Sequence, residues 1–574
     1  MLQAEMFEVA ASRRKGLAPQ FVLLMTTVAA VSCGNPDLGS DHLQLHLVNV
    51  SATRTFDGAP QNPESMAAQL MVTVSGPDME TVASDPMDFS QSTFDIPEFP
   101  QGLERQFMVE YLNGQQVVAR GRSVPLDVVE GGERVRTQVF VSPLNSITPV
   151  TAMDPESGGA VVSSPPFMKT VGASMTQLDD GRILICGGAD VKAGRGTWFM
   201  PEDVTNITDA CQTYDPRTGE FKVVAKRMAI KRAFHQAVKL GGPNNPDGRV
   251  VLIGGFTEKV PGTVSISDSV AIFDPVTGDF VEARDKGGSA GLAGGAGRAL
   301  FTAALVNPDL NLVAIFGGLS NYSAAGGTWE LLYFDGSTMT TVKHEQLFNE
   351  ADPAHGIVRY NHSMIRVSGF ADDWNANQGL EAFLLIGGEN PSGVIDVLEP
   401  YIVDCPNVSN CKLTRYDDMV VSLPGGGRTM TAVAYDQTHN LVFLVGGFRT
   451  PGADEPFWRI DVFGVARAAF KDGFINMGRS VGGMTSVPLS NGTFLMAGGY
   501  GWDAPVSSLG LLNPNERIVQ DGKTTVRISF QTELPSFVTG RVGLSAIEDL
   551  TGRVLIMGGF SGDDVPAEAA LYVP

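Results

Sequence analysis

The sequence is poor in basic residues and in long apolar runs. Its 574 residues include 41 lysines and arginines against 63 aspartates and glutamates, which gives a formal net charge of −22. Nucleic-acid binding needs a basic surface, so this balance argues against a nucleic-acid partner. After residue 33, no apolar run is long enough to span a membrane. A chain of this length is expected to form two or more domains.

Cysteine is also scarce, with only five residues. Without Cys33, four remain: Cys186, Cys211, Cys405 and Cys411. The first two fall on strands predicted to be antiparallel neighbours, and the last two flank a short loop. We therefore predict two local disulfides, which suit an oxidising envelope compartment. The spacing is not that of a zinc motif, and we predict no metal and no other cofactor.

The first 33 residues have the layout of a targeting segment. Arg13, Arg14 and Lys15 precede an apolar stretch, 17–32, which suits a signal core but is short for a transmembrane helix. Residues 1–33 are therefore predicted to be a signal peptide.

The end of this segment, Ala30-Val31-Ser32-Cys33, resembles the lipobox of bacterial lipoproteins. In that family the cysteine is lipidated and becomes the new N-terminus. The resemblance implies a membrane anchor at Cys33. Because Gly34 replaces the aspartate that usually retains such proteins on the inner membrane, it also implies an outer-membrane location. The alternative is an ordinary cleaved signal followed by a chance cysteine.

A first domain is predicted over residues 42–146, after a polar spacer, 34–41. Asn113-Gly114 marks a hairpin turn within it. Its strand-like runs are 43–50, 67–76, 105–123 and 135–142. Their spacing predicts a small β-sandwich, with a loose resemblance to immunoglobulin-like or transthyretin-like modules. We expect a stalk role, with a separate binding function as the alternative, and a linker at 147–159.

A repeated phrase organises the remainder of the chain. An apolar strand ends in a glycine pair seven times: Gly187-Gly188, Gly254-Gly255, Gly317-Gly318, Gly387-Gly388, Gly446-Gly447, Gly498-Gly499 and Gly558-Gly559. A basic residue opens the strand before each of these: Lys169, Arg232, Arg298, Arg359, Arg428, Arg479 and Arg541. Turns within 213–221 and 272–280 introduce a third and a fourth strand. Each unit is therefore predicted to be a four-stranded antiparallel meander.

This pattern resembles kelch repeats, in which a basic residue, a Gly-Gly strand and an Asp-Pro-x-Thr-Gly turn follow one another. The resemblance covers residues 160–574 and implies an all-β, seven-bladed kelch-type propeller. Radial packing would bury both faces of each meander. The last unit lacks a fourth strand, and we expect residues 160–167 to supply it and close the ring.

Two histidines, His235 and His362, occupy the same repeat position, three residues after Arg232 and Arg359. The innermost strands of a propeller line its channel, where two imidazoles can bind a metal or move a proton. We favour a structural role, with hydrogen bonds to the backbone of a neighbouring blade. The other units place Gly172, Phe301, Thr431, Gly482 and Leu544 at that position. Because the basic residue recurs in every unit, we expect it to pair with acidic residues or carbonyls between blades.

Aromatic residues gather in the loops after the second strands. They are Trp198, Phe199, Trp329, Phe457, Trp458, Tyr500 and Trp502. The connectivity of a meander places these loops on one face, together with the connections between blades. Exposed aromatic rings beside polar residues suit protein hot spots or sugar stacking. The alternative is that each ring packs under its own loop.

The sequence names neither a ligand nor a reaction. No catalytic set is recognisable, including that of galactose oxidase-type copper enzymes, so an enzyme is not the favoured interpretation. We expect a monomeric envelope lipoprotein whose propeller binds an envelope protein or a glycan through its loop-rich face. A carbohydrate-modifying propeller, such as an epimerase or an oxidase, is the alternative.

Overall fold

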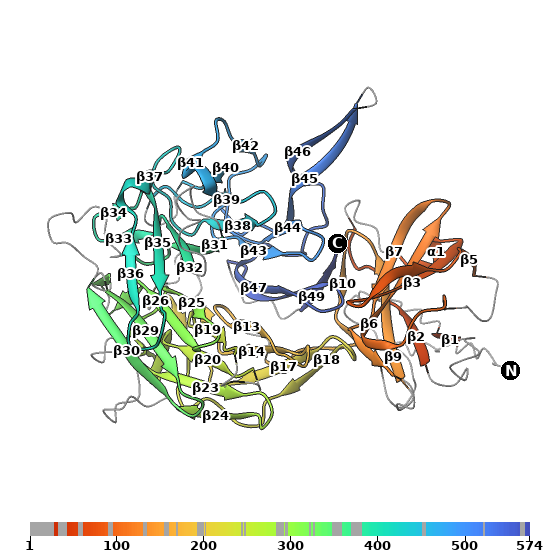
Figure 1. The fold of residues 1–574 in the computed structure, drawn as a ribbon, viewed down its shortest axis with the longest axis horizontal. Helices are drawn as coiled ribbons and strands as arrows, with labels where there is room; N and C mark the ends of the chain where they lie inside the picture. Colours follow the sequence, from red (N-terminus) through yellow and green to blue (C-terminus); the bar gives the residue numbers. More distant parts are fainter. Residues whose placement is uncertain are drawn as a thin grey trace, which may run out of the picture.

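A computed structural model gives the fold of the chain (Figure 1). It describes residues 28–32, 43–55, 61–89, 96–129, 135–153, 160–167, 170–191, 200, 202–242, 245, 248–282, 292, 297–320, 323–324, 328–346, 359–368, 381–450, 455–520, 523–562 and 569–574. An N-terminal sheet lies beside a ring of seven small sheets. The structure therefore confirms an all-β fold with a seven-bladed propeller.

Each blade is an antiparallel meander of four main strands. Blade 1 holds β13 (Ser174–Gln177), β14 (Ile183–Cys186), β17 (Cys211–Asp215) and β18 (Glu220–Val223). Blade 2 holds β19 (Gln236–Lys239), β20 (Val250–Ile253), β23 (Val270–Asp274) and β24 (Asp279–Glu282). Blade 3 holds β25 (Thr302–Asn307), β26 (Leu312–Phe316), β29 (Thr328–Phe334) and β30 (Met339–Gln346). Blade 4 holds β31 (Ser363–Val367), β32 (Glu381–Ile386), β35 (Val397–Asp404) and β36 (Lys412–Arg415), with β37 (Val421–Ser422) also on β35.

The remaining blades follow the same order. Blade 5 holds β38 (Ala432–Asp436), β39 (Leu441–Val445), β40 (Arg459–Gly464) and β41 (Ala469–Phe470), with β42 (Ile475–Asn476) also on β40. Blade 6 holds β43 (Thr485–Pro488), β44 (Phe494–Ala497), β45 (Gly510–Gln520) and β46 (Lys523–Gln531). Blade 7 holds β47 (Val542–Glu548), β48 (Val554–Phe560), β49 (Ala570–Val573) and β10 (Ser146–Pro149).

Short hairpins lie outside these sheets. They are β11 (Thr151–Met153) with β12 (Ala160–Val162), β15 (Asp190–Val191) with β16 (Val204–Thr205), β21 (Phe256–Val260) with β22 (Thr263–Ile266), β27 (Leu319–Ser320) with β28 (Ser323–Ala324), and β33 (Glu389–Asn390) with β34 (Gly393–Val394).

The second strands form the centre of the packing because both of their faces are buried. In β14, Leu184 packs in a cluster with blade 2, whereas Ile183 packs in a cluster with blade 7. The same alternation recurs around the ring, so one apolar cluster fills each junction between neighbouring blades. This two-sided burial explains why these strands read as continuous apolar runs in the sequence.

The ring is closed by a strand other than the one expected. β10, at Ser146–Pro149, pairs with β49 and supplies the fourth strand of blade 7. Residues 160–162 instead form β12, which pairs with β11. The expectation for 160–167 was therefore wrong, and the predicted linker at 147–159 contains part of the closing strand. Ile147 explains the choice, because its side chain is 4% exposed and packs between blades 6 and 7.

The N-terminal sheet has the order β1-β2-β9-β7-β6-β3-β4, with β5 on β3 and β8 on β6. Its strands are β1 (Val28–Ser32), β2 (Leu43–Asn49), β3 (Gln69–Gly76), β4 (Met79–Ala83), β5 (Met87–Asp88), β6 (Gly102–Asn113), β7 (Gln116–Arg122), β8 (Leu126–Val128) and β9 (Val135–Pro143), and a short helix, α1, spans Pro63–Met66. The hairpin at Asn113-Gly114 is confirmed, with Gly114 at φ 63°. The strands share one apolar core but form one hydrogen-bonded path, so the two-sheet sandwich stays a prediction.

β1 falls inside the segment that the sequence predicts to be a signal peptide, and that prediction stays untested. In the described part of the chain, no helix combines the length and the apolarity needed to cross a bilayer.

Ring closure by β10 leads to a direct comparison of two substitutions. Ile147→Asp places a charge in the cluster between blades 6 and 7, and we expect it to lower the free energy of unfolding by about 3 kcal/mol or more. Val161→Asp is the matched control because Val161 is 44% exposed in β12. We expect the control to change stability by less than about 0.5 kcal/mol. Denaturant titration measures both, and equal losses would refute closure by β10.

Candidate functional site: the loop face of the propeller

One end of the propeller, here called the loop face, gathers the glycine pairs, the loops after the second strands and the connections between blades. The second glycine of a pair donates its N–H to a carbonyl of the next blade. Gly188 donates to Arg232 (2.9 Å), Gly255 to Arg298 (2.7 Å) and Gly318 to Arg359 (2.8 Å). Glycine is required here because φ is positive, as at Gly255 (94°), and a Cβ there would collide with Ala233 and His235 of its own blade.

The side chains of the same arginines bind within their own blade, in contrast to the pairing between blades that we expected. The Arg298 guanidinium lies 2.7 Å from the Glu330 carboxylate. Arg359 pairs with Glu399, and Arg428 lies 2.7 Å from Asp461. Each carboxylate belongs to the third strand of that blade. The Arg232 guanidinium donates to the carbonyls of Leu252, Gly254 and Ser269.

Two units depart from the register predicted from the sequence. In blade 6, the carbonyl that accepts from Gly447 belongs to Val481 (3.1 Å), two residues after Arg479. Arg479 is half-buried and donates to Ser508 and Leu509. In blade 1 the corresponding residue is Thr170, and the predicted residue Lys169 lies outside the described residues. The positions equivalent to His235 are therefore Ala173 and Met484 in these units, and not Gly172 and Gly482.

A ring of left-handed residues lies at the start of the first strands. It consists of Gly172, Phe234, Leu300, Asn361, Met430, Gly483 and Gly543, whose φ values lie between 50° and 69°. Backbone bonds connect successive members: Asn361 donates to Leu300 (3.1 Å), and Met430 donates to Asn361 (3.0 Å). A positive φ costs about 1 kcal/mol or more in a bulky residue. Phe234, Leu300 and Met430 adopt it because the ring fixes the backbone on both sides.

The two histidines follow members of this ring and are buried, with 6% exposure each. His235 Nε2 lies 2.9 Å from the Ser174 hydroxyl of blade 1. His362 Nε2 lies 2.8 Å from the Thr302 hydroxyl of blade 3. Burial, with a smaller contribution from the preceding arginine, lowers the pKa of each imidazole to about 3. Each neutral ring therefore connects two blades, through a hydroxyl rather than through the backbone that we expected.

Glu389 is a buried carboxyl group at a position that is apolar or aromatic in the other blades. It directly follows the Gly387-Gly388 pair, and its equivalents are Ala189, Phe256, Leu319, Phe448, Tyr500 and Phe560. It is 3% exposed, and its Oε1 accepts a 2.7 Å hydrogen bond from Asn361 Nδ2. Burial raises the pKa of Glu389 to about 7, against the opposing hydrogen bonds from Asn361 and Thr429. Sequence reasoning missed this residue, although the sequence places a carboxyl group at a repeat position that is apolar or aromatic in the other blades.

The predicted aromatic binding residues divide into two groups. Trp329 and Phe457 are both 0% exposed, which corrects the expectation that they belong to an open face. Trp329 packs within β29 against the cluster of blades 3 and 4. Phe457 lies under the Arg428 guanidinium, 4.1 Å from it. Trp198 and Phe199 lie outside the described residues.

The exposed group flanks one connection, 477–482, between blades 5 and 6. Trp458 is 39% exposed and meets Phe474, 47% exposed, edge to face with 4.9 Å between ring centroids. The Trp458 carbonyl accepts from Met477 at one end of the connection. Tyr500, which is half-buried, accepts from Gly482 at the other end, and Trp502 beyond it is 60% exposed. We call Trp458, Phe474 and Trp502 the aromatic patch.

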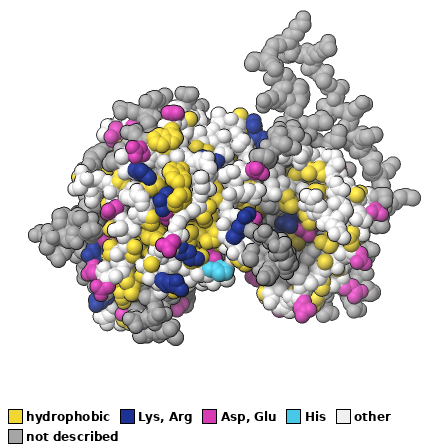
Figure 2. Space-filling model, turned by 90° about the horizontal axis from the view of Figure 1, so that it is seen from above, with side chains coloured by type: hydrophobic (Ala, Val, Ile, Leu, Met, Phe, Trp, Pro, Cys, Tyr) yellow, Lys and Arg dark blue, Asp and Glu magenta, His cyan; other side chains and the backbone are white. Residues whose placement is uncertain are grey.

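On the side where β41, β42 and β46 lie in Figure 1, the propeller shows a band of hydrophobic side chains bordered by charges of both signs (Figure 2). Arg459, beside Trp458 in the chain, lies over the Phe474 ring at 4.5 Å. Its guanidinium also pairs with the buried Asp461, which fixes its position.

Both predicted disulfides are present. Cys186 and Cys211 are cross-strand partners of β14 and β17, with 4.2 Å between their Cα atoms. Cys405 and Cys411 close a loop between β35 and β36, with 4.1 Å between Cα atoms. Cys33 lies outside the described residues. Among the described residues, no group of three or more His, Cys, Asp or Glu side chains is arranged to hold a metal ion.

Comparison with known proteins finds distant structural neighbours only. No family model matches the sequence, and no curated protein matches it. A fungal alcohol oxidase of the AA5 family, solved in complex with copper, is 12% identical, with a TM-score of 0.46 over 71% of this chain and 75% of its own. The structure of YjhT is 13% identical, with a TM-score of 0.39 over 64% of this chain and 99% of its own.

The buried Glu389 predicts a pH-dependent stability. Because its pKa is higher in the folded than in the unfolded state, its contribution is most favourable below about pH 4.5 and is lost as the pH rises to 7. Glu389→Gln keeps the acceptor for Asn361 and cannot ionise. We expect its stability relative to the wild type to rise by up to about 3 kcal/mol between pH 5 and pH 8. Denaturant titrations across this range, with the exposed Glu533→Gln as control, test it, and a constant difference would contradict it.

Proposed function

We propose that the protein is a binding module that recruits a protein partner through the aromatic patch. The observation that supports this is the distribution of exposed aromatic rings. Among the described residues, the large aromatic side chains with more than a third of their surface exposed are Trp458, Phe474 and Trp502. All three flank the single connection between blades 5 and 6.

The chemistry of the patch suits a protein interface. Tryptophan and arginine are enriched among the residues that dominate binding energy. Trp458 and Phe474 already contact each other, and Arg459 is held between Phe474 and Asp461. Side chains that are ordered before binding lose little conformational entropy on association. The patch therefore offers apolar area with a fixed cation beside it.

We further propose that the chain is anchored to a bacterial envelope through a lipid on Cys33. The support is the sequence of residues 1–33, which has a basic region, an apolar core and a cysteine in a lipobox-like setting. The two disulfides are consistent with an oxidising compartment. The N-terminal sheet would then lie between the anchor and the propeller.

Photo-crosslinking tests the binding proposal. A photoreactive phenylalanine derivative is placed at position 458 or 502, and the full-length protein is irradiated in its native envelope. We expect a discrete protein adduct at both positions, identified by mass spectrometry. Position 276 is the control, because Val276 is 75% exposed on a turn at the opposite end of blade 2.

The outcome separates the two candidate ligand classes. Adducts shared by positions 458 and 502 but missing at 276 would support the protein partner and name it. If correctly folded protein gives no protein adduct at either position, the protein-partner proposal is wrong for this patch. Glycan arrays with the wild type and Trp502→Ala would then test the carbohydrate alternative.

Lipid anchoring gives a separate prediction. In a bacterial host, we expect the wild type to incorporate labelled fatty acid and to sediment with membranes, and Cys33→Ser to do neither. Ser32→Ala keeps a small residue before the cysteine and is expected to behave as the wild type. Fractionation and fatty-acid labelling measure this, and membrane retention of unlabelled Cys33→Ser would exclude the anchor.

A further inference from the structure

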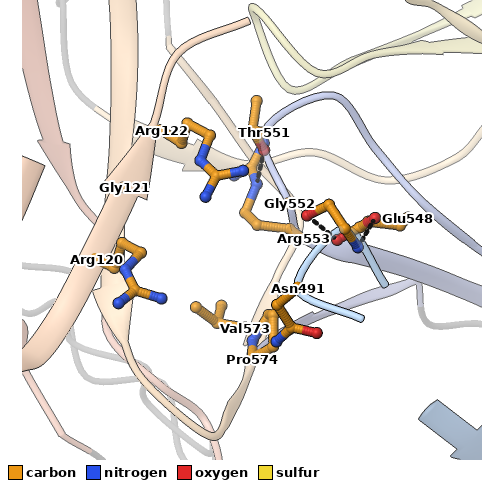
Figure 3. A pocket seen from close by; sticks show the side chains of 11 residues that line it. Arg120, Gly121, Arg122, Asn491, Glu548, Thr551, Gly552, Arg553, Val573 and Pro574 are labelled. Carbon is orange, nitrogen blue, oxygen red and sulfur yellow. Dashed lines mark hydrogen bonds between the residues drawn. The ribbon is translucent and has the colours of Figure 1, made fainter. Parts of the chain in front are cut away.

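A small pocket of about 40 Å³ lies between the N-terminal sheet and blades 6 and 7, at the end of the propeller opposite the loop face (Figure 3). Arg120 and Arg122 line it from β7. Asn491, on the turn between β43 and β44, and Gly552, on the turn between β47 and β48, line it from the propeller. The pocket is therefore assembled from segments that are far apart in the sequence.

Several contacts between the two parts of the molecule lie beside this pocket, and Arg54 also pairs with Ile147 of β10. Gln106 Nε2 donates to the Leu550 carbonyl at 2.9 Å. Arg553, in blade 7, lies over the Phe140 ring of β9 at 5.1 Å. Its guanidinium also donates hydrogen bonds to Thr551, Tyr214 and Pro216, so its position is fixed by the propeller. The walls of the pocket are thus fixed by contacts that do not use Arg120 or Arg122.

Two guanidinium groups from β7 face the same space. Arg120 is paired with Glu110 at 2.7 Å. Arg122 is half-buried, and no carboxylate of the described residues lies within 4.0 Å of its guanidinium nitrogens. Burial, and then the charge of Arg120, lower the pKa of Arg122. Two cations thus share a partly desolvated space that the Glu548 carboxylate also lines, and the negative charges of Glu548, Glu110 and Asp549 oppose the lowering of the Arg122 pKa.

Among the other polar groups at the pocket, the Asn491 side chain presents a hydrogen-bond donor to it. Ser490 binds the Glu548 carboxylate through its N–H (2.7 Å) and its hydroxyl (3.0 Å). Asn491 Oδ1 accepts from the N–H and the hydroxyl of Thr493, so its amide nitrogen is left as the donor on the pocket side (Figure 3). Arginine and amide N–H groups are the donors that proteins use for carboxylate and phosphate oxygens.

The size of the pocket limits the ligand. One water needs roughly 10–15 Å³ measured in this way, so the pocket holds about three atoms of that size. This matches the three heavy atoms of a carboxylate group, or part of a phosphate group with its remaining atoms toward the opening.

We propose that this pocket is a binding site for a small oxyanion, a carboxylate or a phosphate group, held by Arg122, Arg120 and the Asn491 amide. Because its ligating groups come from both the N-terminal sheet and blade 6, the bound anion joins the two parts of the molecule. The site is separate from the aromatic patch, and neither proposal depends on the other.

Isothermal titration calorimetry on the full-length protein tests this, with sodium acetate or inorganic phosphate added at constant ionic strength against chloride. We expect saturable binding of at least one anion to the wild type. Binding of acetate or of phosphate then shows whether the site holds a carboxylate or a phosphate group. Arg122→Gln is expected to weaken binding by about tenfold or more, the usual effect of losing a charge-assisted hydrogen bond. Arg527→Gln removes an equal charge from the distant β46 and is expected to bind as the wild type.

A second variant keeps the test valid if Arg122→Gln folds poorly. Asn491 lies in an exposed turn, and Asn491→Asp keeps the Oδ1 acceptor for Thr493 while replacing the donor with a negative charge. It is expected to weaken anion binding by about tenfold or more with an unchanged melting temperature in chloride. The proposal is overturned if neither anion binds the wild type, or if Asn491→Asp and Arg527→Gln bind the anion equally well.

Discussion

The propeller depends on the junction between a glycine pair and the first strand of the next blade. The second glycine donates its N–H across the junction to a backbone carbonyl, as Gly255 does to Arg298. The arginine that supplies this carbonyl directs its guanidinium into its own blade, to a third-strand carboxylate such as Glu330. One residue thus fixes the spacing to the preceding blade and the internal register of its own. Breaking such a pair would leave a buried charge unpaired, so these positions tolerate little change.

The sequence predicted this architecture well because the junction needs particular residue types. Glycine pairs are required by positive φ values, and the apolar second strands are required by burial on both faces. The blade count and the meander order are confirmed for this reason. Both predicted disulfides are also present. The predicted register is wrong in blades 1 and 6 because a basic residue, Lys169 or Arg479, precedes the true junction residue by one or two positions. The left-handed residues Gly172 and Gly483 mark the true register, and their conformation is a property of the ring rather than of local sequence.

Other features were decided by packing that the sequence does not display. Residues 146–149 and 160–162 are both short runs with strand propensity. Residues 146–149 become the closing strand of blade 7 because Ile147 is buried between blades 6 and 7. Trp329 and Trp502 both follow glycine pairs, yet one is enclosed by the strands of blades 3 and 4 and the other is exposed. Local composition cannot separate these outcomes, because the neighbouring blade supplies the contacts that bury or expose a ring.

The position of the N-terminal sheet connects the two proposed sites. Two of its described contacts with the propeller go to Leu550 and Arg553, at the end of blade 7 opposite the glycine pairs, and residues 53–54, which follow β2, bond to Ile147 of β10. The aromatic patch lies at the glycine-pair end of blades 5 and 6, so these contacts leave it open. If Cys33 carries the anchor, the N-terminal sheet lies between the membrane and the propeller. The proposed anion pocket lies between β7 and the turns of blades 6 and 7, so a ligand bound there would contact both parts of the molecule.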